Sequence, residues 1–360
     1  MRLLIAGGGT GGHLYPGIAV AEEVVRRGGQ VLFVGTSRGL EARAVPAAGY
    51  PLELLEVSGL KRVGFMAALR SLFLLPKAFF RSLAILRRFR PDAVLGVGGY
   101  ASGPLVLVAA LLRYPTAIQE QNSVPGITNR ILSRLVRKVI VAFDEAGRFF
   151  PPRKTETIGN PVRSKLVANL TAGSGTDSST PHILVVGGSQ GARAVNELVL
   201  AAFEKLAKAG SLPASVHQTG PTDQARCSER YRIIGVADQV EVRPFIDDMA
   251  AAYHQASLVI GRAGALTLAE LAIAGRPAIL IPLPTATDDH QSKNAARFAQ
   301  AGAAIVLNQR TSTGTDLAQL LTELLADPGR RQSMATAMRS LSRPNAAGDI
   351  VDRLEKLGGH

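Results

Sequence analysis

The chain of 360 residues has little sulfur and few aromatic residues: it contains one cysteine, Cys227, and no tryptophan. A single cysteine excludes an intrachain disulfide and a cysteine-ligated metal cluster, and it suits a reducing compartment. Aromatic residues make up only 5% of the chain and no known binding module occurs, which argues against a nucleic-acid partner. There is no stretch of about 18 uncharged apolar residues, so we predict no transmembrane helix. The first apolar run, residues 3–6, is too short for a signal peptide.

Apolar and basic residues are abundant. Hydrophobic residues make up 46% of the chain, and 41 Lys and Arg against 28 Asp and Glu give a net charge of +13. Apolar runs alternate with helical stretches, which is typical of α/β proteins with parallel sheets. Because the chain is too long for one ordinary core, we expect two such domains. The excess positive charge favours nucleic acid, an anionic membrane or a phosphate-rich substrate as partner.

The most informative stretch is the first glycine turn, residues 7–12, which consists of five glycines and Thr10. An apolar strand pattern precedes the turn and an amphipathic helical pattern follows it. Glycines let a ligand approach the backbone, and the N–H groups at a helix start favour an anionic or polar ligand. A similar turn recurs at residues 187–192, in the second half of the chain. We therefore expect a ligand held between two domains, each of which contains such a strand, glycine turn and helix.

A dinucleotide site is an alternative interpretation of the first turn, because Gly7, Gly9 and Gly12 match the pattern G-x-G-x-x-G. Such a site needs an acidic residue at the end of the second strand to bind the ribose. No acid directly follows the predicted second strand, residues 30–35, and the nearest one, Glu41, comes late. The sequence therefore argues against NAD, and we expect no cofactor.

Residues 59–90 are rich in apolar and basic residues and include no acid. The pattern is helical, with a bend or a restart expected at Pro76. A core helix needs one apolar face and tolerates acids on the other, whereas this composition is typical of a helix on an anionic membrane. A buried crossover helix with a solvated basic face is the alternative. The residues expected to associate with the membrane are Lys61, Arg62, Phe65, Leu69, Arg70, Leu72, Phe73, Lys77, Phe80 and Arg81.

Polar residues follow several predicted strands. Glu120 and Asn122 come at the carboxyl end of one strand, which is where ligands bind in open α/β sheets. Glu270 lies early in a predicted helix after another glycine turn, where a carboxylate can accept both hydroxyls of a ribose; a solvated helix acid is the alternative. Asp288 and Asp289 are adjacent but lack companion ligands, so we predict no metal site.

Six motifs occur in a fixed order: G-G-G-T-G-G-H at 7–13, E-Q-N at 120–122, G-N-P-V-R at 159–163, G-G-S-Q-G-A at 187–192, G-R-A-G-A-L-T at 261–267 and D-D-H-Q-S-K-N at 288–294. Together they resemble the MurG family of peptidoglycan N-acetylglucosaminyltransferases over nearly the whole chain. The resemblance implies an α/β GT-B fold, in which two Rossmann-like, doubly wound parallel-sheet domains face a cleft. We expect domains at residues 1–163 and 164–341, with a C-terminal helix at 342–360 that packs on the N-terminal domain.

The resemblance also implies an activity. Family members transfer N-acetylglucosamine, with inversion, from UDP-N-acetylglucosamine to undecaprenyl-pyrophosphoryl-MurNAc-pentapeptide (lipid I), and so form lipid II at the cytoplasmic face of the inner membrane as peripheral proteins. The connector at 171–181 is longer than usual, and the tryptophan often found near the family's membrane patch is absent. By position, the donor-binding residues are Thr10, Gly11, Gly12, Asn122, Arg163, Ser189, Ile246, Ala265, Leu266, Thr267, Leu268, Ala269, Glu270 and Gln291.

His13 matches the histidine proposed as the catalytic base in this family. An inverting transfer needs a base for the attacking hydroxyl and a group that neutralises the leaving diphosphate. Helix N-termini and glycine-turn amides supply the second without a metal, and the ordinary pKa of histidine, about 6.5, suits the first. Glu120 is the alternative base. A UDP-sugar 2-epimerase on the same fold and a UDP-sugar sensor without turnover are the competing functions.

Overall fold

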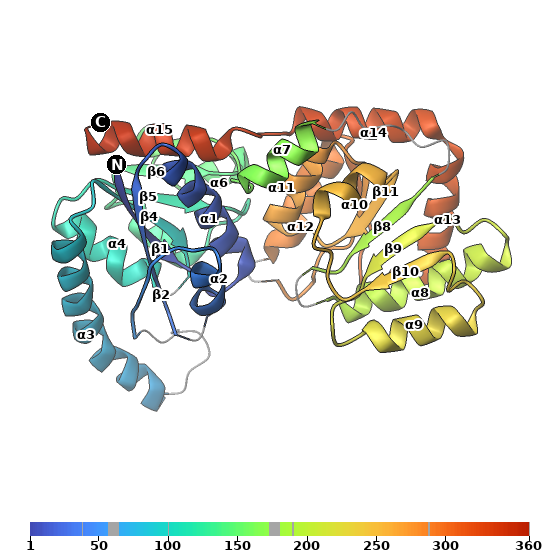
Figure 1. The fold of residues 1–360 in the computed structure, drawn as a ribbon, viewed down its shortest axis with the longest axis horizontal. Coiled ribbons are helices and arrows are strands. Elements are labelled where there is room, and N and C mark those ends of the chain that lie inside the picture. The colour runs from blue at the N-terminus through green and yellow to red at the C-terminus, as the bar shows by residue number, and fades with distance from the viewer. Residues whose placement is uncertain are drawn as a thin grey trace. The chain divides into compact units, whose positions relative to one another are not determined.

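The computed structural model describes residues 1–37, 39–56, 65–99, 101–172, 181–188, 191–286 and 289–359, and for 65–75 it describes the backbone alone. The chain divides into two compact units (Figure 1). Unit 1 comprises Met1–Ser164 with Arg343–His360, and unit 2 comprises Lys165–Ser342. Each unit has its own sheet and its own core, and each is described separately.

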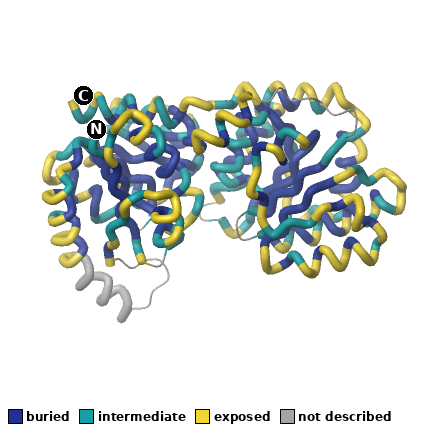
Figure 2. The backbone as a smooth tube through the Cα atoms, in the orientation of Figure 1, coloured by how far each residue is buried: buried dark blue, intermediate teal, exposed yellow. Residues whose placement is uncertain are grey.

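The sheet of unit 1 is parallel throughout, with strands in the order β3-β2-β1-β4-β5-β6-β7. Its central strands β1 and β4 are apolar runs that are buried almost throughout, as in parallel sheets covered on both faces (Figure 2). Leu3 and Ile5 belong to one core cluster and Leu4 to the other, so successive β1 residues serve opposite faces. The strands are β1 (Arg2–Gly7), β2 (Gln30–Gly35), β3 (Leu52–Leu54), β4 (Ala93–Gly98), β5 (Thr116–Glu120), β6 (Lys138–Val141) and β7 (Thr155–Thr157).

Helices cover both faces of this sheet. The last helix, α15, lies beside α1 although the two are far apart in the sequence (Figure 1). Its residues Ile350 and Leu354 join the cluster that contains Leu3, and Arg353 pairs with Glu156 at the end of the sheet. The helices are α1 (Gly11–Arg26), α2 (Glu41–Ala47), α3 (Phe65–Phe89), α4 (Ser102–Leu111), α5 (Ile127–Leu132), α6 (Asp144–Gly147) and α15 (Ala346–Gly358), with a 3-10 turn at Pro152–Lys154.

Unit 2 has a second parallel sheet, with strands in the order β10-β9-β8-β11-β12-β13. The doubly wound α/β fold expected for both halves of the chain is confirmed. The strands are β8 (Ile183–Val186), β9 (Ser215–Gln218), β10 (Val240–Arg243), β11 (Leu258–Gly261), β12 (Ala278–Leu280) and β13 (Ala304–Val306). The helices are α7 (Ser164–Ala172), α8 (Arg193–Lys208), α9 (Gln224–Ile233), α10 (Met249–Gln255), α11 (Ala265–Ala274), α12 (His290–Gln300), α13 (Gly314–Ala326) and α14 (Pro328–Ser340).

Two expectations for the apolar and basic segment need correction. The helix α3 is continuous through Pro76, so of the two alternatives expected there, a bend or a restart, the restart is wrong. The segment has no acid of its own, but β3 and the residues after it bring acids to it: Glu56 pairs with Lys77, and Glu53 pairs with Arg81 and Arg88. Part of its positive charge is therefore compensated by residues that lie outside the segment in the sequence. No helix in the described part of the chain is both long and apolar enough to cross a bilayer.

Candidate active site

The strand orders set where ligands can bind. Each sheet has a switch point where the order of strands reverses, between β1 and β4 in unit 1 and between β8 and β11 in unit 2. In open α/β sheets, ligands bind outside the carboxyl ends of the strands at such a point. All four of these strands end in a glycine turn. Each unit therefore offers a pair of neighbouring backbone turns at its switch point.

The two turns of unit 1 pack backbone against backbone. The N–H of Gly8 donates to the carbonyl of Gly98 at 3.2 Å. Gly99 has a φ of +84°, and a Cβ there would come within 2.3 Å of the Gly8 carbonyl oxygen. Side chains at these positions would separate the turns, which explains why glycine follows both strands.

His13 lies in the first turn of α1, between these two turns. A Cβ on Gly98 would lie only 2.6 Å from Cδ2 of the imidazole, so residue 98 must be a glycine for the ring to fit. The Oγ1 of Thr10 lies 3.0 Å from Nδ1 of His13. When Nδ1–H donates to Thr10, Nε2 has the lone pair that a general base needs. His13 and Gly11 are half-buried, and Thr10 and Gly12 are exposed.

Glu120 ends β5 and is almost completely buried, with 2% of its surface exposed. Its Oε1 accepts the N–H of Asn122 at 3.0 Å, and its Oε2 accepts Nδ2 of Asn129 at 2.9 Å and the N–H of Gly126 at 3.3 Å. Burial raises the pKa of this carboxyl in spite of these bonds. Both oxygens hold the loop that carries the half-buried Asn122, so the geometry suits a residue that shapes this loop better than one that takes a proton from a substrate.

Three buried amides connect the carboxyl ends of the neighbouring strands. Gln119 donates from Nε2 to Oδ1 of Asn160 at 3.2 Å, and Gln121 donates to the Val97 carbonyl at 2.9 Å and also to Gln119. Three residues after Asn160, the exposed guanidinium of Arg163 lies 5.8 Å from the centre of the Tyr15 ring on α1. The predicted residue Arg163 therefore belongs to unit 1 and lies beside the helix that carries His13.

The first turn of unit 2 follows β8. Gly187 donates its N–H to the Gln218 carbonyl at 3.2 Å, and Gly191 donates to Gly188 at 2.9 Å. Gly191 has a φ of +74°, and a Cβ there would meet the Thr219 carbonyl oxygen at 2.3 Å. The predicted residue Ser189 lies outside the described residues. Helix α8 begins at Arg193, directly after this turn.

A buried network of polar side chains lies next to this turn. His217 on β9 lies with Nδ1 2.7 Å from the Tyr231 hydroxyl and Nε2 3.1 Å from Oδ1 of Asn196. Burial lowers the pKa of His217 to about 3, so the imidazole is neutral at physiological pH. Asn196 donates in turn to the Thr219 carbonyl and to Asp223. The network links α8 to the carboxyl end of β9, and sequence analysis assigned none of these residues a role.

The second turn of unit 2 joins β11 to α11, and side-chain hydrogen bonds connect it to the loop after β12 and to α12. Arg262 donates to the carbonyls of Ile281 and Pro282 at 2.9 and 3.2 Å, and burial lowers the pKa of its guanidinium. The wholly buried Asn294 donates to the Ala263 carbonyl at 3.3 Å. The predicted residue Gln291 accepts the N–H of Leu283 at 3.0 Å through Oε1, and so it holds the same loop.

Helix α11 carries six of the predicted donor residues at or near its N-terminus, as the sequence predicted for its start at Ala265. Ala265 and Leu268 are buried, whereas Leu266, Thr267, Ala269 and Glu270 are half-buried. Ile246, in the loop after β10, is also buried. The buried positions can serve a ligand through backbone and packing, and the half-buried ones also through their side chains.

Tyr253 on α10 holds the carboxylate of Glu270. The ring of Tyr253 is wholly buried, and its hydroxyl donates to Oε2 of Glu270 at 3.1 Å. Burial and the neighbouring Glu270 carboxylate together raise the pKa of Tyr253 well above its usual value. Nothing in the sequence indicated this pair, because the two residues meet only when α10 packs against α11.

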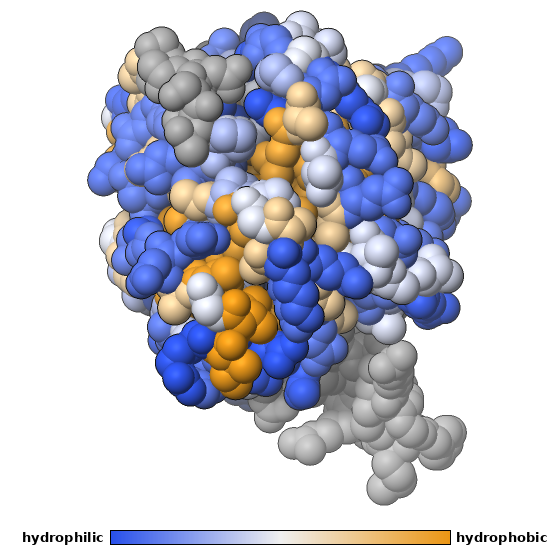
Figure 3. All heavy atoms as spheres, turned by 90° about the vertical axis from the view of Figure 1, so that its right-hand side faces the viewer, coloured by the Kyte–Doolittle hydropathy of each residue, from blue (hydrophilic) through white to orange (hydrophobic). Residues whose placement is uncertain are grey.

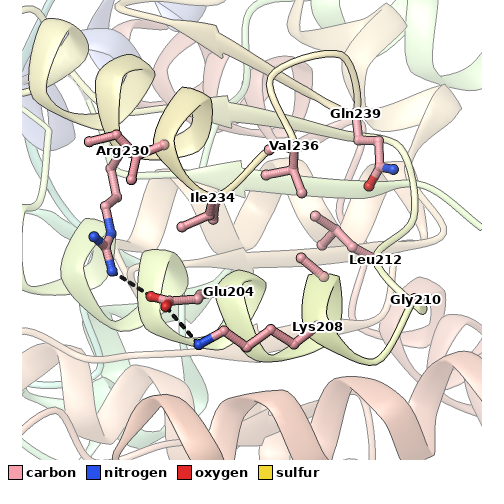
Figure 4. Close-up of a pocket in the computed structure, with 11 residues that line it drawn as sticks. Glu204, Lys208, Gly210, Leu212, Arg230, Ile234, Val236 and Gln239 are labelled. Atoms are coloured by element: carbon pink, nitrogen blue, oxygen red, sulfur yellow. Dashed lines mark hydrogen bonds and ion pairs between the residues drawn. The ribbon is translucent and has the colours of Figure 1, made fainter.

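A groove of about 500 Å³ lies elsewhere in unit 2, between the C-terminal ends of α8 and α9 (Figure 4). In it, Glu204 pairs with Lys208 and Arg230 beside the apolar residues Leu212 and Ile234. No residue predicted from the sequence lines this groove. Elsewhere, in the part of the chain that the structure describes, no group of three His, Cys, Asp or Glu side chains is arranged to hold a metal ion.

Comparison with known proteins identifies the family. The model of the glycosyltransferase family 28 N-terminal domain matches residues 3–141, and that of the C-terminal domain matches residues 182–353. The chain belongs to glycosyltransferase family 28. The resemblance to the MurG family seen in the six motifs is confirmed by this match and by the relatives below, and both switch points lie inside the matched regions.

Several individual proteins are similar to this chain over nearly its whole length. Proteins from Anaeromyxobacter dehalogenans and Myxococcus xanthus are 51% identical over 354 and 358 residues, covering 98% of this chain and 92% of each relative. Both are named UDP-N-acetylglucosamine–N-acetylmuramyl-(pentapeptide) pyrophosphoryl-undecaprenol N-acetylglucosamine transferase. The crystal structure of MurG from Acinetobacter baumannii is 35% identical, with a TM-score of 0.81 over 99% of both chains. A UDP-GlcNAc 2-epimerase from Neisseria meningitidis is 15% identical, which shows a shared fold alone.

Proposed function

We propose that this chain transfers N-acetylglucosamine from UDP-N-acetylglucosamine to undecaprenyl-pyrophosphoryl-MurNAc-pentapeptide, forming lipid II for peptidoglycan, with inversion and without a metal. The observation that carries the proposal is 51% identity over nearly the whole chain to transferases named for this reaction. The epimerase alternative is supported only by likeness of fold at 15% identity. The donor binds mainly to unit 2 and the lipid-linked acceptor to unit 1.

The donor site is built on α11 and the glycine turns of unit 2. The N–H groups at the start of α11 offer positive partial charge to the diphosphate. Glu270, oriented by Tyr253, accepts the ribose hydroxyls, and Gln291 and Arg262 keep the neighbouring loops in place. Such fixed amides stabilise the negative charge that develops on the leaving UDP.

The acceptor reaction takes place beside the first glycine turn. The MurNAc hydroxyl attacks the anomeric carbon of the donor sugar, and Nε2 of His13 takes its proton. Thr10 at Nδ1 and Gly98 against the ring fix the direction in which Nε2 points. We assign the base to His13 and a loop-shaping role to Glu120, because both oxygens of Glu120 already accept hydrogen bonds from its own loop.

A UDP-release assay tests the function directly. We expect the protein to release UDP from UDP-N-acetylglucosamine only when a short-chain lipid I analogue is present. An epimerase would convert the donor without the acceptor, and a sensor would bind it without releasing UDP. Either of those results would refute the transferase proposal, and saturable UDP binding is the control that the protein is folded.

We further propose that unit 1 binds an anionic membrane surface. Of the residues predicted for this contact, Lys61 and Arg62 lie outside the described residues, and the side chains of Phe65, Leu69, Arg70, Leu72 and Phe73 are not described. In the described part of α3, Phe80 is 66% exposed, and Lys77 and Arg81 are exposed but paired with acids. Helix α4 packs on α3 and α5 packs on α4, and they add exposed apolar residues and arginines. Between residues 101 and 143 the one acid is the buried Glu120. The exposed residues of this α4–α5 face include Leu107, Leu111, Leu112, Arg113, Ile127, Ile131, Arg134, Leu135 and Arg137.

We propose that the protein binds the cytoplasmic face of the inner membrane as a peripheral membrane protein. The cytoplasmic leaflet contains anionic lipids, and each Lys or Arg near its surface contributes about 1 kcal/mol to the free energy of binding. The single, buried cysteine suits the reducing cytoplasm. Reversible attachment of this kind would bring the acceptor side of the enzyme to its lipid-linked substrate.

Removing two arginines of the α4–α5 face should weaken membrane binding. For Arg113→Gln with Arg134→Gln we expect about thirtyfold weaker binding to vesicles containing phosphatidylglycerol, the equivalent of about 2 kcal/mol. Vesicle co-sedimentation measures this, and Arg232→Gln with Arg310→Gln, two exposed arginines of unit 2, is the control of equal charge. Equal binding by both double variants would contradict the assignment of the face.

A further inference from the structure

Glu41 is a buried acid for which the reaction described above has no use. It is the first residue of α2 and only 1% exposed. Its Oε2 accepts the N–H of Gly9, in the first glycine turn, at 2.7 Å. Its Oε1 accepts both the N–H and the Oγ1–H of Thr36, directly after β2, at 2.8 and 2.7 Å. Burial opposes ionisation, but the backbone bonds outweigh it and lower the pKa of Glu41, so the group is an anion.

The surrounding backbone is shaped around this carboxylate. A Cβ on Gly8 would lie 2.2 Å from the Glu41 side chain, one on Gly35 would lie 2.4 Å away, and one on Gly39 only 2.0 Å. These glycines come from three separate segments: the first turn, the end of β2 and the loop before α2. Because none of the three has a side chain, they form a cradle that leaves space for the Glu41 carboxylate.

This position corrects the sequence-based argument about a dinucleotide. We expected no acid at the end of the second strand, and that expectation is wrong, because Oε1 of Glu41 accepts two hydrogen bonds from Thr36, directly after β2. In a dinucleotide site the acid binds a ribose while the turn N–H groups bind phosphate. Here the acid itself occupies the Gly9 N–H.

We propose that Glu41 is an internal anion that takes the phosphate-binding place in the first glycine turn, and that it is a positioning residue for His13. An N–H bound to one anion is not available to a second, and like charges repel. The turn therefore excludes a nucleotide phosphate from the Gly9 N–H, so that the first turn serves His13 instead. The exclusion of nucleotide is independent of the proposed function, whereas the positioning of a catalytic base rests on it.

A short path connects Glu41 to the imidazole. Gly9, which has a φ of +89°, is followed by Thr10. The Thr10 carbonyl accepts the N–H of His13 at 3.2 Å and that of Leu14 at 3.1 Å, and the Thr10 Oγ1 contacts Nδ1 of His13. A change in the direction of the Gly9 N–H therefore moves the residue that sets both the backbone and the ring of His13.

The isosteric variant Glu41→Gln tests the positioning role. Its amide group cannot accept from both sides of the cradle, so we expect kcat for UDP release to fall about tenfold. We also expect the His13 Cε1–H resonance to shift in the two-dimensional NMR spectrum, where six histidines give six signals. The matched control is Asp92→Asn, whose carboxylate accepts the Arg2 N–H at 2.6 Å at the amino end of the same sheet. An unshifted His13 signal, or an equal change in both variants, would overturn the proposal.

Truncation provides a second, independent test. Glu41→Ala leaves the cradle without its anion, and we expect formate at millimolar concentration to restore the His13 signal and most of the lost kcat. Formate should have no effect on the wild type or on Asp92→Asn. No rescue in a variant that still binds UDP would refute an anion-filled turn. If the wild type proves inactive while formate still restores the His13 signal, the proposed reaction fails and the role of Glu41 stands.

Discussion

His13→Ala should lower kcat for UDP release at least hundredfold, the scale expected for loss of a general base. The binding of UDP should stay within a few fold of the wild type, because most of the proposed donor contacts belong to unit 2. The physical reason is the fixed ring: Thr10 at Nδ1 and Gly98 at Cδ2 hold the imidazole where it can take a proton at Nε2. Single-turnover UDP release with a lipid I analogue measures the effect.

The variant Thr10→Val gives the matched, smaller perturbation. It keeps the shape of the side chain but removes the Oγ1 contact to Nδ1, so we expect a loss of activity well below that of His13→Ala. A His13→Ala enzyme with activity within threefold of the wild type would move the base elsewhere, and Glu120 would be the first residue to test.

Much of the scaffold could be predicted from the sequence because the signals are local. The central strands β1, β4 and β11 are apolar runs that end in glycine, and a run buried on both faces needs no partner information to be recognised. The glycine turns gave the positions of the loops at the two switch points for the same reason. Helix α11 begins at Ala265 as expected, one residue after Gly264.

Most of the contacts that were not predicted join different secondary-structure elements. In the sequence, Glu41 comes too late after β2 to be recognised as an acid at the end of that strand. Its contact with Thr36 depends on three glycines that leave room for its side chain. The acids that pair with α3 come from β3 and the residue stretch after it, so the composition of residues 59–90 overstated the free positive charge. Residue spacing carries no information about such pairs, which exist only once two elements pack together.

Glu270→Ala is the second variant with a large expected effect: we expect the KM for UDP-N-acetylglucosamine to rise about hundredfold with little change in kcat. The proposed carboxylate accepts both ribose hydroxyls, and a hydrogen bond to a charged group contributes about 1.5–3 kcal/mol. Inhibition by UDP and by 2′,3′-dideoxy-UDP separates this role from a structural one. The wild type should bind UDP far more tightly than the dideoxy analogue, and the variant should bind the two almost equally.

Tyr253→Phe extends the same argument to the residue that orients the carboxylate. The variant keeps the buried ring and removes only the hydroxyl that lies 3.1 Å from Glu270, so KM should rise several fold and the preference for UDP over the dideoxy analogue should shrink. Tyr231→Phe is the matched control, because Tyr231 is equally buried in unit 2 but its hydroxyl meets His217. If both phenylalanine variants changed the preference equally, the effect would reflect packing of unit 2. A change confined to Tyr253→Phe would instead mean that a buried hydroxyl, through Glu270, sets how strongly this site discriminates the ribose.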